Sequence, residues 1–476
     1  MNTMPGTVKL SKQELLPMVT ALRTVVDAKL AATATFAERE AAWLAVSNQV
    51  TCLAIQGVLQ ELADSCGESM LIEGVPHHEH LKGTVDYHSL CGTFPIHRAT
   101  YRRDGERSGP TVVPLDLWAG IVERATPALA YDVMQGIAKE DMRSHRETLV
   151  AAHRAPPSRS TLERMAQHIG DGARTASARI EAYVRRDEPL PEGAHAISCG
   201  LDRVAVPMEE LRPEGAPPRS RKRRKPRVRK APAPVEVKYR MAYIGTVSIV
   251  DKDGEVLVTR KYAIPASDDP KTGIANKMAA DVKTLKRKNP ALGVGVVQDG
   301  APEMWNLLRE ALAQHPEIGT VLEAIDRFHL MERLGKGLVI VEPDDAVRKS
   351  LLREWTVLFE HRDSAIDSVE LWLIKRHAGL GVDKAAELWD HLTYIRRNKD
   401  RMRYVSMRLA GLPVGSGATE GGCKSVVGKR ACGSGQRWHE SGLRNVLMLR
   451  ALHQSRRLPT FWSHMARRYT AKVAVG

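Results

Sequence analysis

The sequence predicts an α/β protein in which a mostly helical N-terminal region precedes a domain with a mixed sheet and a helical insertion. Three observations predict this fold class. Apolar residues recur at threes and fours over residues 10–62, as they do on one face of a helix. Short apolar runs bounded by turn-forming residues alternate with helical segments over residues 194–325. Helical periodicity then returns over residues 346–409, and a chain of 476 residues is long enough for two or three domains.

The chain is strongly basic: 71 Lys and Arg residues against 56 Asp and Glu residues leave a formal net charge of +15. An excess of this size favours a polyanionic partner such as nucleic acid. No uninterrupted apolar run approaches the roughly 20 residues of a membrane-spanning helix, and the N-terminus lacks the pattern of a secretory signal. The six cysteines are dispersed without a C-x-x-C pair, which is typical of reduced thiols. We therefore expect a cytoplasmic protein that does not associate with a membrane.

The N-terminal part is predicted to hold two regions, residues 1–86 and 87–190. The first is helical. The second begins with a hairpin between Tyr87 and Pro114, where apolar and polar residues are interspersed among turn formers. Helices follow from Leu115 onward.

Two helices of the second region have the order of a DNA-binding helix-turn-helix. They are expected over Glu140–His153 and Thr161–Ile169, on either side of a Pro-Pro break. Ser160 and Glu163 have the spacing of a capping box at the start of the second helix. An ordinary helical hairpin fits the same local sequence equally well.

Residues 212–234 form a basic arm with a different composition. Lysines and arginines crowd the run Arg219–Lys230, and prolines flank it on both sides. Such a segment cannot bury apolar area, so a solvated linker is one interpretation. We favour contact with the DNA backbone, because each cation that reaches a phosphate releases counterions. The residues expected to make this contact are Arg221, Lys222, Arg223, Arg224 and Lys225.

The domain after residue 191 shows the most regular pattern. Three apolar runs predict strands, and a tight turn at Asp251–Gly254 joins the second to the third as a hairpin. A helix, a fourth strand, a helix and a fifth strand follow, which is the order of the ribonuclease H-like fold. The predicted strands are Ala196–Val206, Tyr239–Val250, Glu255–Tyr262, Gly293–Gly300 and Thr320–Ile325, and the helices are Lys271–Lys288 and Pro302–Ala313.

Two acids fall at informative places in this pattern. Asp299 ends the fourth strand, where ligands of open sheets collect, although an acid there also serves as a turn or helix cap. Asp202 stands inside the first apolar run, where a carboxylate costs several kcal/mol unless it is paired or metal-bound. Asp251, in the hairpin turn, competes with Asp202 for the same role.

A third acid follows the helical insertion. Glu420 lies in a Gly-rich segment that leads into a helix, from which it can reach the edge of the sheet. Cations and an aromatic residue follow it, and these residue types hold a DNA strand. A flexible surface loop with a solvated acid is the alternative. The residues expected at the DNA are Lys424, Arg430, Arg437 and Trp438.

Several of these segments, in the same order, resemble bacterial insertion-sequence transposases of the IS-Kra type. They include Gly200–Val204, Tyr239–Thr246, Gln298–Ala301 and Gly415–Glu420, and the resemblance continues to Phe461-Trp462. It covers roughly residues 194–462. It implies a transposase with a ribonuclease H-like domain over residues 191–476, interrupted by the basic arm and by a helical insertion over residues 340–412.

The resemblance also implies the chemistry and the partners. Asp202, Asp299 and Glu420 become the Asp, Asp and Glu that bind Mg²⁺, with Mn²⁺ as a substitute. His329, in an Asp-x-x-His element that starts at Asp326, either contacts DNA or caps a helix. The partners would be element ends and target DNA, bound by a homo-oligomer associated with the bacterial nucleoid. A ribonuclease H-like nuclease or resolvase without strand transfer, and a non-catalytic DNA-binding protein, are the alternatives.

Overall fold

The computed structural model describes residues 10–211, 235–265 and 270–476. It is a mixed α/β structure with two five-stranded sheets. The chain forms two compact units: one runs up to Ala173 and includes Trp462–Gly476, and the other comprises Arg174–Phe461. The division at residue 173 falls between the predicted boundaries at 86 and 190. The basic arm over residues 212–234, with its five expected DNA contacts, lies outside the described residues.

The first unit opens with the two helices α1 (Lys12–Asp27) and α2 (Phe36–Asp64). Each begins with a capping box, in which a hydroxyl and a carboxylate three residues later satisfy each other's backbone donors, Ser11 with Glu14 and Thr35 with Glu38. The helical prediction for residues 10–62 is confirmed, with a break between the helices.

Helix α2 is largely exposed. Within the described ranges it is the helix that is long and apolar enough to cross a membrane, by length and composition only, and 6% of its most apolar window is buried. One helix of this kind is weak support for a membrane segment.

The sheet of the first unit contains a hairpin that is longer than predicted. The structure starts its first strand at Val75 rather than at Tyr87. The added residues alternate between exposed and half-buried positions and carry several histidines, so they lack the apolar signal of a strand. The strands are β1 (Ser69–Ile72), β2 (Val75–Ser89), β3 (Gly92–Arg103), β4 (Thr111–Val112) and β10 (Val473–Val475), in the order β10-β1-β2-β3-β4.

The helices that follow correct the prediction of a helix-turn-helix. Seven residues, Ala152 to Ser158, separate α5 from α6, where the motif has a turn of about three or four. The second helix is 29 residues long rather than short. The helices are α3 (Pro114–Ala119), α4 (Pro127–Lys139), α5 (Met142–Ala151) and α6 (Arg159–Asp187).

The predicted capping box at the start of α6 is also wrong. The hydroxyl of Ser158, directly after the two prolines, accepts the hydrogen bond from the backbone N–H of Thr161 at 3.3 Å. Ser160 therefore lies inside the helix. Glu163 accepts a hydrogen bond from Arg159 at 2.7 Å instead of reaching back to the cap.

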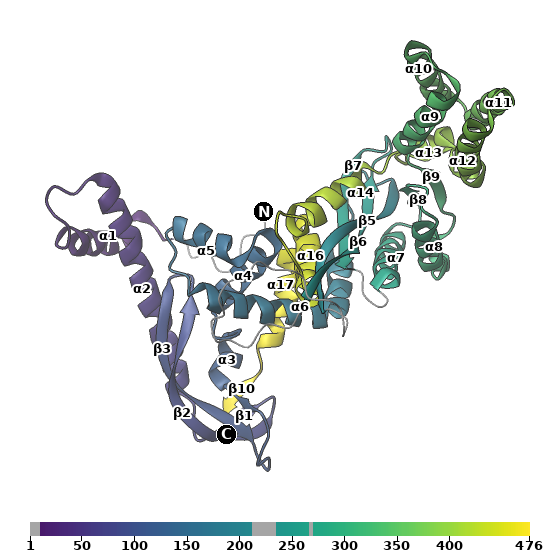
Figure 1. Ribbon diagram of the computed structural model, residues 1–476. Coiled ribbons are helices and arrows are strands. Elements are labelled where there is room, and N and C mark those ends of the chain that lie inside the picture. The colour runs from purple at the N-terminus through teal and green to yellow at the C-terminus, as the bar shows by residue number, and fades with distance from the viewer. Residues whose placement is uncertain (1–9, 212–234, 266–269) are drawn as a thin grey trace. The chain divides into compact units, whose positions relative to one another are not determined.

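The second unit contains the predicted mixed sheet, in the order β7-β6-β5-β8-β9 (Figure 1). β6 is antiparallel to both of its neighbours, whereas β5, β8 and β9 are parallel. All five strand predictions are confirmed, but β5 and β6 are longer than predicted. Their outer ends are less buried, so the sequence shows no continuous apolar run there. The strands are β5 (Ala196–Leu211), β6 (Val235–Val250), β7 (Val256–Pro265), β8 (Gly293–Gln298) and β9 (Leu322–Ile325).

This sheet is buried on both faces. Successive residues of a strand point to opposite faces, and in β6 Tyr243 belongs to one core cluster while Ile244 belongs to another. The first cluster includes residues of α7 (Pro270–Lys288) and α8 (Pro302–Ala313). The second includes residues of α16 (Glu440–Gln454), which packs against β7 and precedes α17 (Leu458–Ala466).

The helical insertion packs on the first of these clusters, beside β9 (Figure 1). It begins directly after β9, earlier than the predicted residue 340. Its helices are α9 (Arg327–Val341), α10 (Asp345–His361), α11 (Ala365–His377), α12 (Val382–Asn398) and α13 (Tyr404–Leu409).

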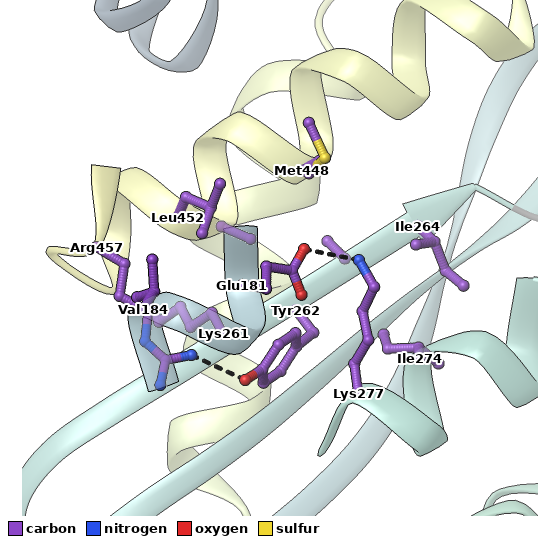
Figure 2. A pocket seen from close by; sticks show the side chains of 12 residues that line it. Glu181, Val184, Lys261, Tyr262, Ile264, Ile274, Lys277, Met448, Leu452 and Arg457 are labelled. Carbon is purple, nitrogen blue, oxygen red and sulfur yellow. Dashed lines mark hydrogen bonds and ion pairs between the residues drawn. The ribbon is translucent and has the colours of Figure 1, made fainter. Parts of the chain in front are cut away.

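A buried ionic network anchors the end of α16 to the sheet. Arg260 and Arg457 flank Asp281, which is fully buried, and Arg260 Nη1 lies 2.6 Å from Asp281 Oδ1. Arg457 also donates to the hydroxyl of Tyr262 at 2.8 Å, as Figure 2 shows, and pairs with Glu188 at 2.7 Å. Burial by itself would raise the pKa of Asp281, but Arg457 and Arg260 lower it to about 2.

Candidate active site

Asp202 lies in the middle of β5, one residue after the buried Leu201. Its Oδ1 accepts a hydrogen bond from the backbone N–H of Arg203 at 2.7 Å, and its Oδ2 accepts one from the thiol of Cys423 at 3.3 Å. Burial, and then the nearby carboxylate, raises the pKa of Cys423, so the thiol stays protonated and donates. Among the described residues no Lys or Arg forms an ion pair with Asp202.

Asp299 follows the last residue of β8 and is exposed. Its Oδ1 accepts a hydrogen bond from the backbone N–H of Ala301 at 2.9 Å, and its backbone carbonyl accepts one from the indole of Trp305 at 2.7 Å. The alternative role as a turn former is therefore real for one carboxylate oxygen. The other oxygen has no hydrogen-bond partner within the described residues and is available to a ligand.

The register of the two parallel strands brings these acids to the same level. β5 pairs with β8 so that Cys199 lies beside Val296. Continuing this offset along both chains places Asp202 level with Asp299 on neighbouring strand positions.

Glu420 is held over this level by a short helix, α14 (Gly417–Gly422), which continues through a π-helical turn (Cys423–Gly428) into α15 (Lys429–Ala431). The hydroxyl of Thr419 shares a hydrogen bond of 2.7 Å with that of Thr246 on β6. Gly200 makes the close approach possible, because a Cβ at that position would come within 2.2 Å of the Thr419 hydroxyl. The sequence therefore seats the helix of the third acid directly on the strands of the sheet.

Asp326 joins the end of β9 to the Glu420 segment. It is 2% exposed, and its carboxylate accepts the backbone N–H of His329 at 3.0 Å and that of Ser416. Asp326, rather than His329, is thus the residue that caps α9. His329 instead directs its Nε2 to Glu420 Oε1, at 3.4 Å, and Ser416 Oγ lies 3.4 Å from the same oxygen.

Asp251, the competitor of Asp202, lies at the other end of the sheet. Its neighbour Val250 pairs with Ala196 at the start of β5, whereas Asp202 pairs with Ile244. Its carboxylate accepts the backbone N–H groups of Asp253 and Glu255, both at 2.9 Å, and so stabilises the hairpin turn.

The three acids line one cavity of about 280 Å³, together with His329 and Lys424. Their oxygens have the donor chemistry that Mg²⁺ or Mn²⁺ takes. Over the described ranges, however, no group of three His, Cys, Asp or Glu side chains is gathered closely enough to hold a metal ion. The donor set fits a hard divalent cation in type, and its side chains face a common space without converging on one point. We call this space the carboxylate cavity.

Gln298 is a residue of this cavity that sequence analysis passed over. It is 1% exposed, and its Oε1 accepts the backbone N–H of Leu201 at 3.3 Å. Its Nε2 is buried without a hydrogen-bond partner among the described residues. A buried amide N–H in this state can donate to a water or to a ligand oxygen. Its signal in the sequence was one amide at the end of an otherwise apolar strand.

The four residues expected to surround Glu420 with DNA contacts separate in the structure. Lys424 lines the carboxylate cavity. Arg430 stacks on Trp438, with 5.0 Å between guanidinium and ring, and the Trp438 ring packs on the second core cluster of the sheet. Arg437 is exposed. The indole N–H of Trp438 donates to the backbone carbonyl of Ala431 at 3.1 Å, and its backbone pairs with the extended end of β5 at Met208.

No protein-family model matches the chain, and no curated protein does. Among solved structures the chain is similar to the Drosophila P element transposase strand transfer complex, with 12% sequence identity and a TM-score of 0.25. The similarity covers 72% of this chain and 83% of that one.

Proposed function

We propose that this chain is a DNA transposase with a ribonuclease H-like core, which cleaves the strands at the ends of an insertion sequence and joins them to target DNA. The observation that carries the proposal is the meeting of three carboxylates in one cavity, although they lie far apart in the sequence at Asp202, Asp299 and Glu420. The strand order, with β6 as the antiparallel member, supports the ribonuclease H-like assignment. The net charge of +15 supports a DNA partner.

The three carboxylates would hold Mg²⁺, or Mn²⁺ in its place. When bound, two such ions activate an attacking oxygen and stabilise the leaving oxygen of a phosphodiester. No covalent enzyme intermediate is needed. Water attacks first and frees a 3′-hydroxyl at the element end, and this hydroxyl then attacks a phosphodiester of the target in line.

The other residues of the carboxylate cavity position these groups. Asp326 fixes the start of the Glu420 helix, and His329 and Ser416 orient the Glu420 carboxylate. The unpartnered Nε2 of Gln298 donates to a non-bridging phosphate oxygen, and Lys424 offsets the charge of the strand. We further propose that the enzyme acts in the bacterial cytoplasm, at the nucleoid, as a homo-oligomer on paired element ends.

The test uses the purified chain and a labelled DNA that carries the inverted repeats flanking its gene. We expect Mg²⁺-dependent nicking at the repeat end and joining of that 3′ end to a target plasmid. Asp299→Asn should abolish both reactions while DNA binding stays nearly intact, and Asp251→Asn, the matched control, should leave both unchanged. Cleavage without joining would favour a nuclease or resolvase, and tight binding without cleavage in Mn²⁺ would favour a DNA-binding protein.

A further inference from the structure

A second cavity, of about 640 Å³, begins at the residue after Asp299. One wall is formed by Gly300 and the start of α8, and the other by α9, α12 and the turn that follows α12. It thus lies between the end of β8 and the helical insertion. We call it the arginine cavity, because Arg333, Arg397 and Arg401 line it and Asp390 is the one acid among its lining residues.

Two of the three guanidinium groups have unused hydrogen-bond donors. Arg401 is engaged, since it pairs with Glu323 at 2.9 Å and stacks on Trp305 at 4.3 Å. Arg333 stacks on the ring of Tyr394 at 4.0 Å, and its Nε is buried without a hydrogen-bond partner. Arg397 is exposed, and no acid within the described residues pairs with it.

The neighbour of Arg397 shows what a structural arginine looks like on the same helix. Arg396 donates from Nε to Glu370 at 2.7 Å, and it also stacks on Trp389 at 4.9 Å. It therefore ties α12 to α11. Arg397, one residue later, points into the arginine cavity and has no such role, so its charge is left for a partner from outside the chain.

The remaining polar groups of the arginine cavity suit the same kind of partner. Burial raises the pKa of Tyr394, so its phenol stays protonated, and the hydroxyl has no hydrogen-bond partner in the described part of the chain. Its ring packs on the backbone of Gly300, where a Cβ would come within 2.4 Å of the ring. The exposed amide of Asn306 lies on the opposite wall. Guanidinium, phenol and amide N–H groups together form a donor set for phosphate oxygens.

We infer that the arginine cavity is a second phosphate-binding site, which holds the backbone of the nucleic-acid strand whose scissile phosphodiester lies in the carboxylate cavity. The inference rests on the proposed function for the identity of that strand. Asp299 lines the carboxylate cavity and the next residue, Gly300, lines the arginine cavity. On this proposal a strand that leaves the carboxylates meets the arginines next. On this account the helical insertion contacts the substrate and does not serve as a spacer.

The test measures binding of a short labelled single-stranded oligonucleotide by fluorescence anisotropy, in EDTA and over a series of salt concentrations. The logarithm of the binding constant K falls as the logarithm of the salt concentration rises. If Arg397 contacts one phosphate, Arg397→Ala should make this slope shallower by about 0.7, the value for one contact to a single strand. Arg397→Lys should restore most of the slope because it keeps the charge. Arg353→Ala is the matched control, since Arg353 is exposed on α10 and does not line the arginine cavity.

Arg333→Ala is the second variant and should lower the slope in the same way. Its stacking on Tyr394 means that its folding must be checked by circular dichroism, and Arg397→Ala keeps the test decisive if Arg333→Ala fails to fold. Unchanged slopes in both folded variants would overturn the inference. A site for free phosphate would instead bind labelled inorganic phosphate, lose it in Arg397→Ala, and leave the oligonucleotide slope unchanged, which overturns the inference as well.

The outcome is separable from that of the proposed function, because no divalent metal and no cleavage enter the measurement. A protein that cleaves DNA but shows no change in slope keeps the proposed function and loses the arginine cavity as a phosphate site. A protein that shows the change but never cleaves loses the proposed chemistry and keeps the phosphate site.

Discussion

The second unit holds two groups of charged side chains that are built in opposite ways. In the ionic network around Asp281, the carboxylate is fully buried and both neighbouring arginines pair with it. In the carboxylate cavity, Asp299 is exposed and no cation within the described residues pairs with it. A charged group that stabilises a fold makes its ion pairs and hydrogen bonds within the protein. A charged group that binds a ligand leaves some of these interactions unmade.

The largest effect should follow from removing one member of the ionic network around Asp281. Asp281→Ala leaves the buried Arg260 and Arg457 with Glu188 as their one remaining shared acid within the described residues. Loss of one member of such a group costs about 3–5 kcal/mol. Urea unfolding of the full chain should show this loss. Glu317→Ala is the control, because Glu317 pairs with Arg287 at the surface and its loss should cost less than about 1 kcal/mol. Equal losses in the two variants would contradict the comparison.

Asp326 shares a property with each of the two groups. It is buried like Asp281, and it accepts the backbone N–H groups of Ser416 and His329, which line the carboxylate cavity. Asp326→Asn should weaken the hold on the Glu420 helix and lower strand cleavage by about 10- to 100-fold, as for outer residues of a metal site. The Mg²⁺ concentration for half-maximal cleavage should rise. Asp344→Asn is the control, because Asp344 caps α10 in the same way away from the cavity, and a matching loss there would reduce Asp326 to a cap.

Acid should weaken the ionic network around Asp281. The pKa of Asp281 is lowered to about 2 in the folded chain, below its ordinary value of about 3.9. Its contribution is therefore complete above about pH 5 and is lost as the pH falls through 4 toward 2, with a total of about 2–3 kcal/mol. Unfolding free energies measured between pH 5 and 2 should fall less steeply in Asp281→Ala than in the natural chain. Parallel curves would show that Asp281 is not the titrating group.

The smallest effect concerns the thiol beside Asp202. Cys423→Ala removes one weak hydrogen bond to the carboxylate, so its effect on stability should be about 1 kcal/mol or less. Because burial raises the pKa of Cys423, its alkylation at pH 8 should be much slower than that of a model thiol. Alkylation kinetics followed by mass spectrometry check this. Rapid modification of Cys423 would contradict the burial of its thiol.

Local pattern predicted the elements of the sheet well. Apolar runs marked all five of its strands, and an acid at the end of β8 indicated the candidate site. The register that brings Asp202 level with Asp299 came from pairing between strands that lie far apart in sequence, which local periodicity does not carry. The same limit hid the pairing of β10 with β1 and the contact of Asp326 with Ser416.

Residue type alone does not show what an arginine or a tryptophan contacts in the folded chain. Arg430 and Trp438 are expected at the DNA because cations and an aromatic residue follow Glu420. In the structure they stack on each other beside the second core cluster, and their contact with DNA stays a prediction. Arg333 and Arg397 carried no signal, because isolated arginines on amphipathic helices are ordinary surface residues. They gain a meaning only where α9 and α12 meet the end of β8.

The most direct measurement compares strand cleavage in Mg²⁺ by Asp202→Asn, Asp299→Asn and Glu420→Gln, singly and in pairs, with Asp251→Asn as the control. If the three carboxylates act as one unit, each single variant should lose about a thousandfold or more, and the pairs should lose no more than the singles. The free energy of unfolding of each variant should stay near that of the natural chain, because none of these residues belongs to the ionic network around Asp281. Retained Mg²⁺-dependent cleavage in Asp299→Asn, or loss of cleavage in Asp251→Asn, would contradict the account.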